Sequence, residues 1–211
     1  MKKRHVIAAT AALITCNAGA YTVSLQNFVG ADATAVPIID NAGNAIASGG
    51  GFIAAGTYAT APTNAVEALE LFSFGVGSNQ LGAAFGGLDG FFTNSFVAPI
   101  PEGNTDPPVG ERLYVVWANQ PALNSATEVA VFDTGLVFGT ENAVGQGGLD
   151  VIITDAVLTP ANLLVGSIAT DLDLGVGVTF SEGIQLAPIP EPSTSLLAAL
   201  AGLGLVARRR R

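Results

Sequence analysis

The sequence predicts a mainly β protein: a single sandwich- or barrel-like domain with one short helix, flanked by two targeting segments. Short apolar or alternating runs, most of them bounded by Gly, Asn, Asp or Pro, recur along residues 21–187. Such spacing is typical of all-β sandwiches and barrels. Of the 211 residues, 49% are apolar, which is enough for one domain with its own core. The chain thus divides into residues 1–20, an acidic body of residues 21–187 and a tail of residues 188–211.

The first segment has the three parts of a secretory signal peptide. Bases at positions 2–4 precede an apolar run over residues 6–16, and a small-x-small ending follows at Ala18 and Ala20. This layout predicts cleavage after Ala20, with Tyr21 as the new N-terminus and with the secretion translocon and signal peptidase as partners. A buried N-terminal helix and a lipoprotein lipidated at the segment's cysteine are the alternatives.

The only histidine and the only cysteine, His5 and Cys16, both lie in this segment. Once it is removed, the mature chain has no side chains for a disulfide, a thiol nucleophile, a Cys/His zinc site or a Ser-His-Asp triad. We therefore expect no catalytic residues and no enzyme activity.

The body is strongly acidic. Residues 21–187 hold 16 carboxylates against a single base, Arg112. Proteins bind nucleic acid by neutralising its phosphates with Lys and Arg. We therefore expect no nucleic-acid partner.

Eight runs in the body are predicted to be strands because of their β-type patterning and turn-forming boundaries. A long exposed loop is predicted between the third and the fourth, at residues 100–111, where Pro, Gly, Asn and Asp are dense. The predicted strands are residues 21–29, 51–60, 90–97, 112–118, 127–132, 149–158, 163–170 and 175–186.

One helix is predicted after the second strand. Asn64 can cap it, and Glu67 follows three residues later, as in a capping box. The helix is expected to run up to Gly75. Its apolar face would consist of Val66, Leu69 and Phe72.

The tail also has three parts. Prolines at positions 188, 190 and 192 exclude a helix or a central strand, so this stretch is expected to be extended and exposed. An apolar helix is predicted over residues 196–207, short for a bilayer, which needs about 20 residues. A helix packed on the domain is the alternative, although residues 196–207 contain no polar stripe. By the positive-inside rule, cytoplasmic residues that stop transfer are expected to be Arg208, Arg209, Arg210 and Arg211.

The string Pro190-Glu191-Pro192, the apolar segment and the terminal arginine cluster occur in this order at the end of the chain. Together they resemble the PEP-CTERM sorting signal of exported bacterial proteins. The resemblance covers the tail only, and it implies that the chain is a substrate of an exosortase, a membrane-embedded cysteine transpeptidase or protease. The enzyme would recognise Pro190, Glu191 and Pro192, cut nearby and pass the body to the cell surface or extracellular matrix. Such proteins are typical of Gram-negative bacteria that make exopolysaccharide.

Candidate metal ligands are few. Asp171, Asp173 and Gly175 give the D-x-D-x-G start of a calcium loop, and Glu182 falls where a closing carboxylate is needed. The residues between alternate like a strand, so an acidic strand edge is the preferred interpretation. We expect no resident metal or cofactor, with millimolar Ca²⁺ binding as the alternative.

Two other features could contact or cleave a glycan. Tyr58, Tyr114 and Trp117 could form a sugar-stacking platform, although Trp117 is assigned to the core because neighbouring strand residues face opposite ways. Arg112 could pair with a nearby acid or bind a sugar acid. The pair Glu67 and Glu70 could in principle serve a glycosidase, but solvated charges are the preferred interpretation.

The sequence therefore predicts an exported, non-catalytic protein of the cell surface, extracellular matrix or biofilm, associated with exopolysaccharide. It would be held transiently in the membrane by its C-terminal helix until an exosortase cuts the PEP motif. The alternatives are permanent anchoring by the uncut tail, a carbohydrate-binding module, and a small carboxylate-dependent glycosidase or lyase.

Overall fold

The computed structural model describes residues 21–28, 34–73, 88–98, 110–138 and 148–190. The predicted signal peptide, most of the predicted loop at residues 100–111, and the tail from Glu191 onward lie outside the described residues. Within the described part, no helix has the length and apolar character needed to cross a bilayer.

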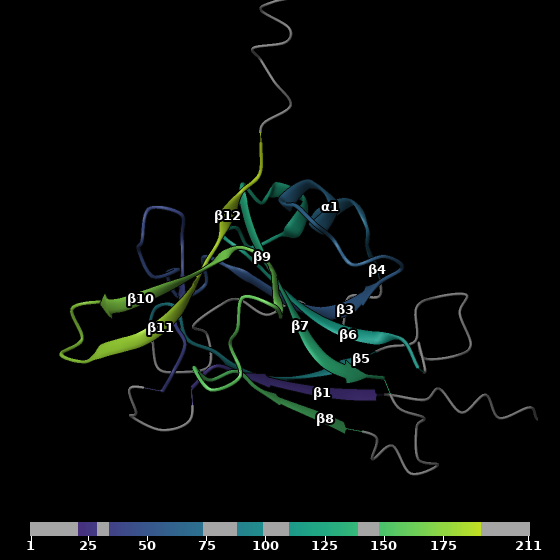
Figure 1. The fold of residues 1–211 in the computed structure, drawn as a ribbon, viewed down its shortest axis with the longest axis horizontal. Helices are drawn as coiled ribbons and strands as arrows, with labels where there is room; N and C mark the ends of the chain where they lie inside the picture. Colours follow the sequence, from purple (N-terminus) through teal and green to yellow (C-terminus); the bar gives the residue numbers. More distant parts are fainter. Residues whose placement is uncertain (1–20, 29–33, 74–87, 99–109, 139–147, 191–211) are drawn as a thin grey trace, which may run out of the picture.

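The larger sheet has β6 at its centre and runs in the order β12-β7-β6-β3-β4, with β9 also on the outer edge of β7 (Figure 1). Its strands are β3 (Phe52–Tyr58), β4 (Phe72–Ser73), β6 (Arg112–Ala118), β7 (Glu128–Val137), β9 (Leu163–Val165) and β12 (Ala187–Pro188). All its pairings are antiparallel. Every residue of β6 after Arg112 is buried, so this strand is covered on both faces.

A second sheet, in the order β5-β1-β8, packs against the first. β1 (Tyr21–Gln26) pairs antiparallel with β5 (Thr93–Ala98) and parallel with β8 (Gly148–Ile152). A main core lies between the two sheets and contains Val23 and Leu25 of β1 together with Val115 and Trp117 of β6. This layered arrangement confirms the predicted mainly β, sandwich-like fold.

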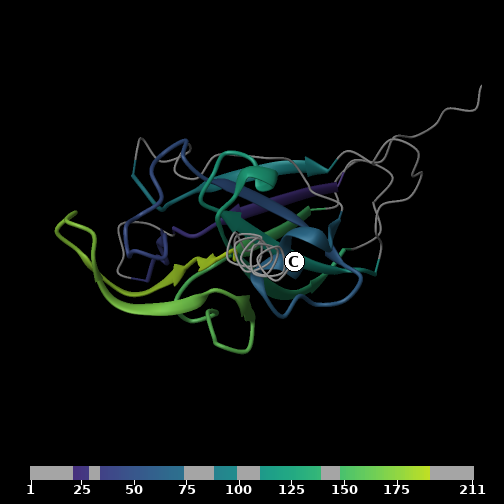
Figure 2. The same ribbon diagram turned by 90° about the horizontal axis from the view of Figure 1, so that it is seen from above.

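A hairpin reaches out sideways from the stacked sheets (Figures 1 and 2). It consists of β10 (Ser167–Asp173) and β11 (Thr179–Gln185), and the two-residue strand β2 (Ile38–Ile39) runs parallel to β11 at its base. Ile184 of β11 belongs to the main core, so the hairpin is attached through its base.

The short helix α1 (Ala65–Glu70) covers the outer face of the larger sheet. As predicted, Asn64 caps it: its side-chain oxygen accepts hydrogen bonds from the N–H groups of Val66 and Glu67, at 3.1 and 3.0 Å. The predicted end at Gly75 is wrong, because the helix stops at Glu70 and Phe72 enters β4. Its fully buried residues are Ala65 and Ala68, whereas the predicted face residues Val66, Leu69 and Phe72 are only half-buried.

Each predicted strand overlaps a strand of the structure, and residues 112–118 match β6 residue for residue. The predicted end at residue 158 is wrong because β8 stops at Ile152, and the predicted end at residue 132 is wrong because β7 continues to Val137. The two-residue strands β2, β4 and β12 were not predicted as separate strands. Two further boundaries differ for a backbone reason. The run at residues 163–170 is divided into β9 and β10 by Gly166, which has a φ of +104°. The run at residues 175–186 becomes a strand only from Thr179, because Gly175 and Gly177 adopt positive φ in the hairpin turn.

Candidate functional site

The described chain ends on the outer edge of β7. We call residues 186–189 the tail root, and it is the candidate functional site. Ala187 and Pro188 of β12 pair with Val129 and Glu128. The backbone N–H of Ile189 then donates to the carbonyl of Thr127 at 2.8 Å. Pro190 is exposed and, like any proline, has no N–H to donate. In the described chain, backbone pairing therefore extends to Ile189, directly before Pro190-Glu191-Pro192.

The tail root is attached to the body from several directions. Leu186, only 1% exposed, lies in the main core, and its N–H donates to the carbonyl of Ile39 at 3.0 Å. Ile189 packs against a second core on the outer face of the larger sheet. That second core contains Tyr58, Ala65, Ala68, Tyr114, Val116, Val129, Val131 and Val165.

At the N-terminal end of β7, the backbone N–H groups already have hydrogen-bond partners other than the tail. The side-chain oxygen of Asn119 accepts from the N–H groups of both Thr127 and Glu128, each at 3.0 Å. Thr127 therefore contributes its carbonyl to the tail root, while its own N–H is satisfied by the β6–β7 turn. The bond from Ile189 thus reaches one residue past the start of β7, which begins at Glu128.

A groove of about 380 Å³ runs beside the tail root. One wall is the start of α1 and another is the end of β9, where the chain turns at Gly166. The third wall is formed by the tail root and Pro190. The lining residues are Thr63, Asn64, Ala65, Val66, Leu164, Val165, Gly166, Ala187, Pro188 and Pro190.

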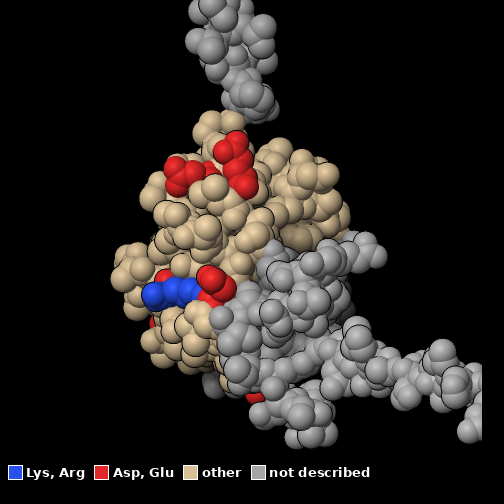
Figure 3. Space-filling view, turned by 90° about the vertical axis from the view of Figure 1, so that its right-hand side faces the viewer, with Lys and Arg blue, Asp and Glu red and all other residues tan. Residues whose placement is uncertain are grey.

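The surroundings of the tail root are acidic. Carboxylates gather at the upper end of the described surface in Figure 3, where β12 lies in Figure 1. Glu128 faces Pro188 across the strand pair and accepts a hydrogen bond from the N–H of Asn41 at 2.8 Å. Glu67, at the start of α1, accepts from the N–H and the hydroxyl of Thr63, and these bonds lower the pKa of its carboxyl.

Of the predicted sorting residues, the structure describes only Pro190. Glu191, Pro192 and the cytoplasmic arginines Arg208 to Arg211 lie outside the described residues, as do Ala18 and Ala20 of the predicted signal-peptide cleavage site. Tyr21, the predicted new N-terminus, is the first residue of β1.

The assignment of Trp117 to the core is confirmed, and the alternative of a sugar-stacking platform is wrong. Tyr58 and Tyr114 are each 5% exposed, and Trp117 is fully buried. The two tyrosine rings contact each other edge to face, with their centroids 5.1 Å apart, beneath α1. Because both faces of β6 are covered, both sets of its alternating side chains are in a core, and no face of this strand meets water.

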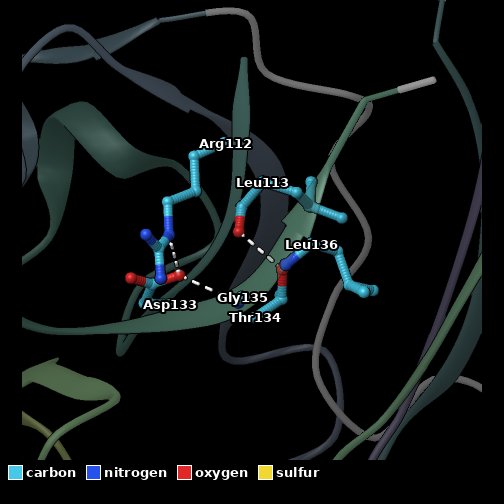
Figure 4. A network of polar contacts seen from close by, with 6 residues as sticks. All are labelled: Arg112, Leu113, Asp133, Thr134, Gly135 and Leu136. Carbon is cyan, nitrogen blue, oxygen red and sulfur yellow. Dashed lines mark hydrogen bonds and ion pairs between the residues drawn. The ribbon is translucent and has the colours of Figure 1, made fainter. Parts of the chain in front are cut away.

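Arg112 pairs with an acid, as one of the two predictions for it proposed. Its Nε lies 2.7 Å from an Oδ of Asp133, and this contact raises the pKa of the guanidinium (Figure 4). The same oxygen accepts from the N–H of Gly135 at 2.9 Å. Thr134 closes the network by donating to the carbonyl of Leu113. The base is thereby held at an irregularity where the β6–β7 register shifts.

The calcium-loop candidates lie on a hairpin and not in a helix-flanked loop. Asp171 and Asp173 are on β10 and Glu182 is on β11, paired across from Thr170. Asp173 accepts from the N–H of Gly175 at 2.9 Å and so stabilises the hairpin turn. Glu182 is half-buried. Within the described residues no three carboxylate, His or Cys groups gather closely enough to hold a metal ion.

Sequence reasoning missed most of the structural use of the carboxylates. Glu67 does bond back to the start of the helix, as a capping-box acid would, but its partner is Thr63, one residue before the cap. Several other acids likewise accept backbone hydrogen bonds. These are Asp40 from Ala42 and Asn44, Asp89 from Ser48, Glu128 from Asn41, Asp133 from Gly135 and Asp173 from Gly175. The Asp-x-Gly strings at residues 133–135 and 173–175 are the signal that could have revealed two of them.

A second groove, of about 300 Å³, lies over the β5-β1-β8 sheet. Gln26 and Thr93 are neighbours across the β1–β5 pair, and the Thr93 hydroxyl lies 3.3 Å from Oε1 of Gln26. Exposed Asp150 and Ile152 of β8 form the opposite side. The groove therefore offers hydroxyl, amide and carboxylate groups next to the exposed apolar side chain of Ile152.

Comparison with known families places the tail root at the start of a sorting signal. The family model of the PEP-CTERM protein-sorting motif matches residues 188–211. Comparisons with curated proteins and with solved structures found no match.

The edge strand β12 leads the β body directly into this C-terminal motif. The chain is similar at that tail to PEP-CTERM proteins, and the motif implies export, transient attachment to the membrane and processing by an exosortase. The motif begins at Pro188, so it overlaps the folded body by the last residues of the tail root.

Proposed function

We propose that the protein is a non-catalytic component of the bacterial surface, extracellular matrix or biofilm, released from the membrane by exosortase and associated with exopolysaccharide. The observation that carries the proposal is the sorting motif at residues 188–211, joined without a linker to a β body. Signal peptidase and the translocon would act on the N-terminal segment first. The Arg208 to Arg211 cluster would hold the tail on the cytoplasmic side until the cut.

The way the carboxylates are used supports a structural role for the body. A glycosidase needs two carboxyl groups facing each other across a substrate. In the described body, backbone N–H groups in turns and at the start of α1 are instead bound by Asp40, Glu67, Asp133 and Asp173. The lone base is likewise held in an ion pair with Asp133.

The groove over the β5-β1-β8 sheet is our proposed contact surface for polysaccharide. A glycan presents hydroxyl groups around weakly apolar ring faces. Gln26, Thr93 and Asp150 can exchange hydrogen bonds with hydroxyls, and Ile152, which is 43% exposed, can cover a ring face. Aromatic stacking has no part in this contact because the candidate aromatic residues are buried.

Delivery is tested on protein recovered from a host that carries the exosortase, with membrane and secreted fractions compared by intact mass. We expect the surface-associated form to lack both residues 1–20 and the Arg208 to Arg211 cluster. A surface form that still carries the cluster would mean permanent anchoring and would overturn the exosortase assignment. Matched expression in a host without the enzyme should leave the tail in place.

The role of the body is tested by co-sedimentation of the processed protein with exopolysaccharide from the same host. We expect Gln26→Ala and Asp150→Ala to weaken binding severalfold. The matched control is Thr170→Ala, an exposed strand residue on the hairpin, which should bind like the wild type. Equal binding by all variants would exclude this groove, and release of new sugar ends during incubation would overturn the non-catalytic assignment.

A further inference from the structure

We propose that the tail root is a permanent part of the mature body, so that exosortase cuts the folded protein on the C-terminal side of Ile189. This inference rests on the proposed function and deepens it, because it assigns the body-side limit of the processing site. The match to the sorting motif begins at Pro188. The motif alone therefore does not distinguish a cut before or within β12 from a cut beyond Ile189.

Each residue of the tail root is buried or paired with a neighbouring strand. Leu186 is in the main core, Ala187 and Pro188 are in register with Val129 and Glu128, and Ile189 is hydrogen-bonded to Thr127. A protease binds its substrate as an extended strand whose backbone groups are free to pair with the enzyme. At these residues that pairing is already made with β7 and β2.

The tail root ends at a single residue, Ile189. Ile189 is the last residue of the described chain with a backbone hydrogen bond to the β6–β7 region, and the next residue, Pro190, is exposed. In the described chain the boundary between paired and exposed residues therefore falls between Ile189 and Pro190. The recognition motif begins at that boundary.

A cut upstream of Ile189 would remove contacts that the tail root makes with the body. Loss of β12 would expose the outer edge of β7 next to β9, and loss of Leu186 would leave a hole in the main core. An unpaired edge strand is a site for aggregation. A cut beyond Ile189 leaves every one of these contacts in the mature protein.

The mature C-terminus tests the inference directly. The full-length chain is produced in the exosortase-bearing host, and the processed form is analysed by intact mass and C-terminal peptide sequencing. We expect a C-terminus at Ile189 or beyond. A C-terminus within residues 185–188 would overturn the inference while leaving exosortase processing intact. A surface form that keeps the arginine cluster would overturn both.

Limited proteolysis of the full chain tests the physical cause with matched variants. Ile189→Pro removes the N–H that binds Thr127 without changing Pro190-Glu191-Pro192, and Ile189→Val keeps it. With a broad-specificity protease that is active in urea, we expect the limit fragments of the wild type and Ile189→Val to retain Ile189. The Ile189→Pro fragment should end several residues earlier.

Digestion in urea separates protection by the fold from resistance of the sequence. We expect bonds at residues 186–189 of the wild type to be cleaved in urea and spared in its absence. Equal fragments from the wild type and Ile189→Pro, or resistance that persists in urea, would overturn the inference.

Discussion

At the scale of single residues, polar side chains in this body mainly satisfy backbone groups. Asn27 is the clearest case, because it is fully buried. Its amide nitrogen donates to the carbonyls of Val36 and Gly90, at 2.8 and 2.9 Å, and its oxygen accepts from the N–H of Phe92 at 2.8 Å. A single asparagine thus joins the end of β1 to two other segments.

We predict that Asn27→Ala lowers the free energy of unfolding by about 3 kcal/mol, because it removes three buried hydrogen bonds and leaves the carbonyl of Gly90 only its bond from the N–H of Ile38. Urea unfolding of the processed protein measures this change. Asn41→Ala is the control, since Asn41 is exposed, and it should cost less than about 0.5 kcal/mol. Equal costs for the two variants would contradict the role of Asn27.

Tyr58 gives the body a dependence on alkaline pH. Burial raises the pKa of its hydroxyl far above the ordinary value of 10.0, and the hydroxyl donates to the carbonyl of Ala68 at 2.8 Å. The folded protein therefore keeps this proton when the unfolded chain has lost it. The stabilisation is complete below the unfolded pKa and is lost as the pH rises above it.

We predict that the urea midpoint falls between about pH 9 and about pH 11, and that Tyr58→Phe makes this fall less steep. Part of the slope should persist, because burial also raises the pKa of Tyr114. At neutral pH, Tyr58→Phe should cost about 1 kcal/mol for the lost hydrogen bond. An unchanged alkaline slope in the variant would show that Tyr58 is not the titrating group.

At the scale of elements, the edge of β7 decides how the C-terminal third of the chain is attached. β9 and β12 pair with successive parts of this edge, and the hairpin β10–β11 leaves the sheet between them. The chain can turn out of the sheet because Gly166 has no side chain. A Cβ at this position would lie 2.8 Å from the carbonyl oxygen of Gln185 and 3.1 Å from Cβ of Ala130.

We predict that Gly166→Ala is more destabilising than Gly175→Ala by about 2 kcal/mol. Both glycines have positive φ, +104° at Gly166 and +74° at Gly175, but a Cβ on Gly175 would meet nothing within 4 Å, so only Gly166→Ala adds a clash to the backbone strain. Thermal unfolding of the two variants provides the measurement. Similar midpoints would mean that the base of the hairpin adapts to a larger residue.

At the scale of the whole molecule, one core connects all the sheets of the described body. The main core takes Leu25 from β1, Trp117 from β6 and Ile184 from β11. Residues from distant parts of the chain therefore lose their apolar contacts together, and unfolding of such a core is cooperative.

We predict a single unfolding transition for the processed protein in urea. Trp117 is the only tryptophan and packs between Phe92 and Phe132, with centroid distances of 6.3 Å to each ring. Its fluorescence reports the main core, whereas far-ultraviolet circular dichroism reports all the sheets. Coincident curves are expected, and an earlier transition seen by only one method would show that a sheet unfolds independently.

The sequence by itself determined the features whose signals act over a few residues. The β6 run at residues 112–118, the Asn64 cap and the order of motifs in the tail could all be predicted, and each depends on local periodicity, capping or composition. The end of α1 could not, because Phe72 leaves the helix to pair with Tyr58 in β3.

Only the tertiary structure decided which faces of the strands are buried and where the tail meets the body. Tyr114 is buried because α1 and β9 residues cover the outer face of the larger sheet, which no alternation along β6 reveals. Ile189 ends the body because Thr127, remote from it in sequence, places a carbonyl beside it. Pairings between distant segments depend on the common core that brings them together, and local patterns carry no information about that core.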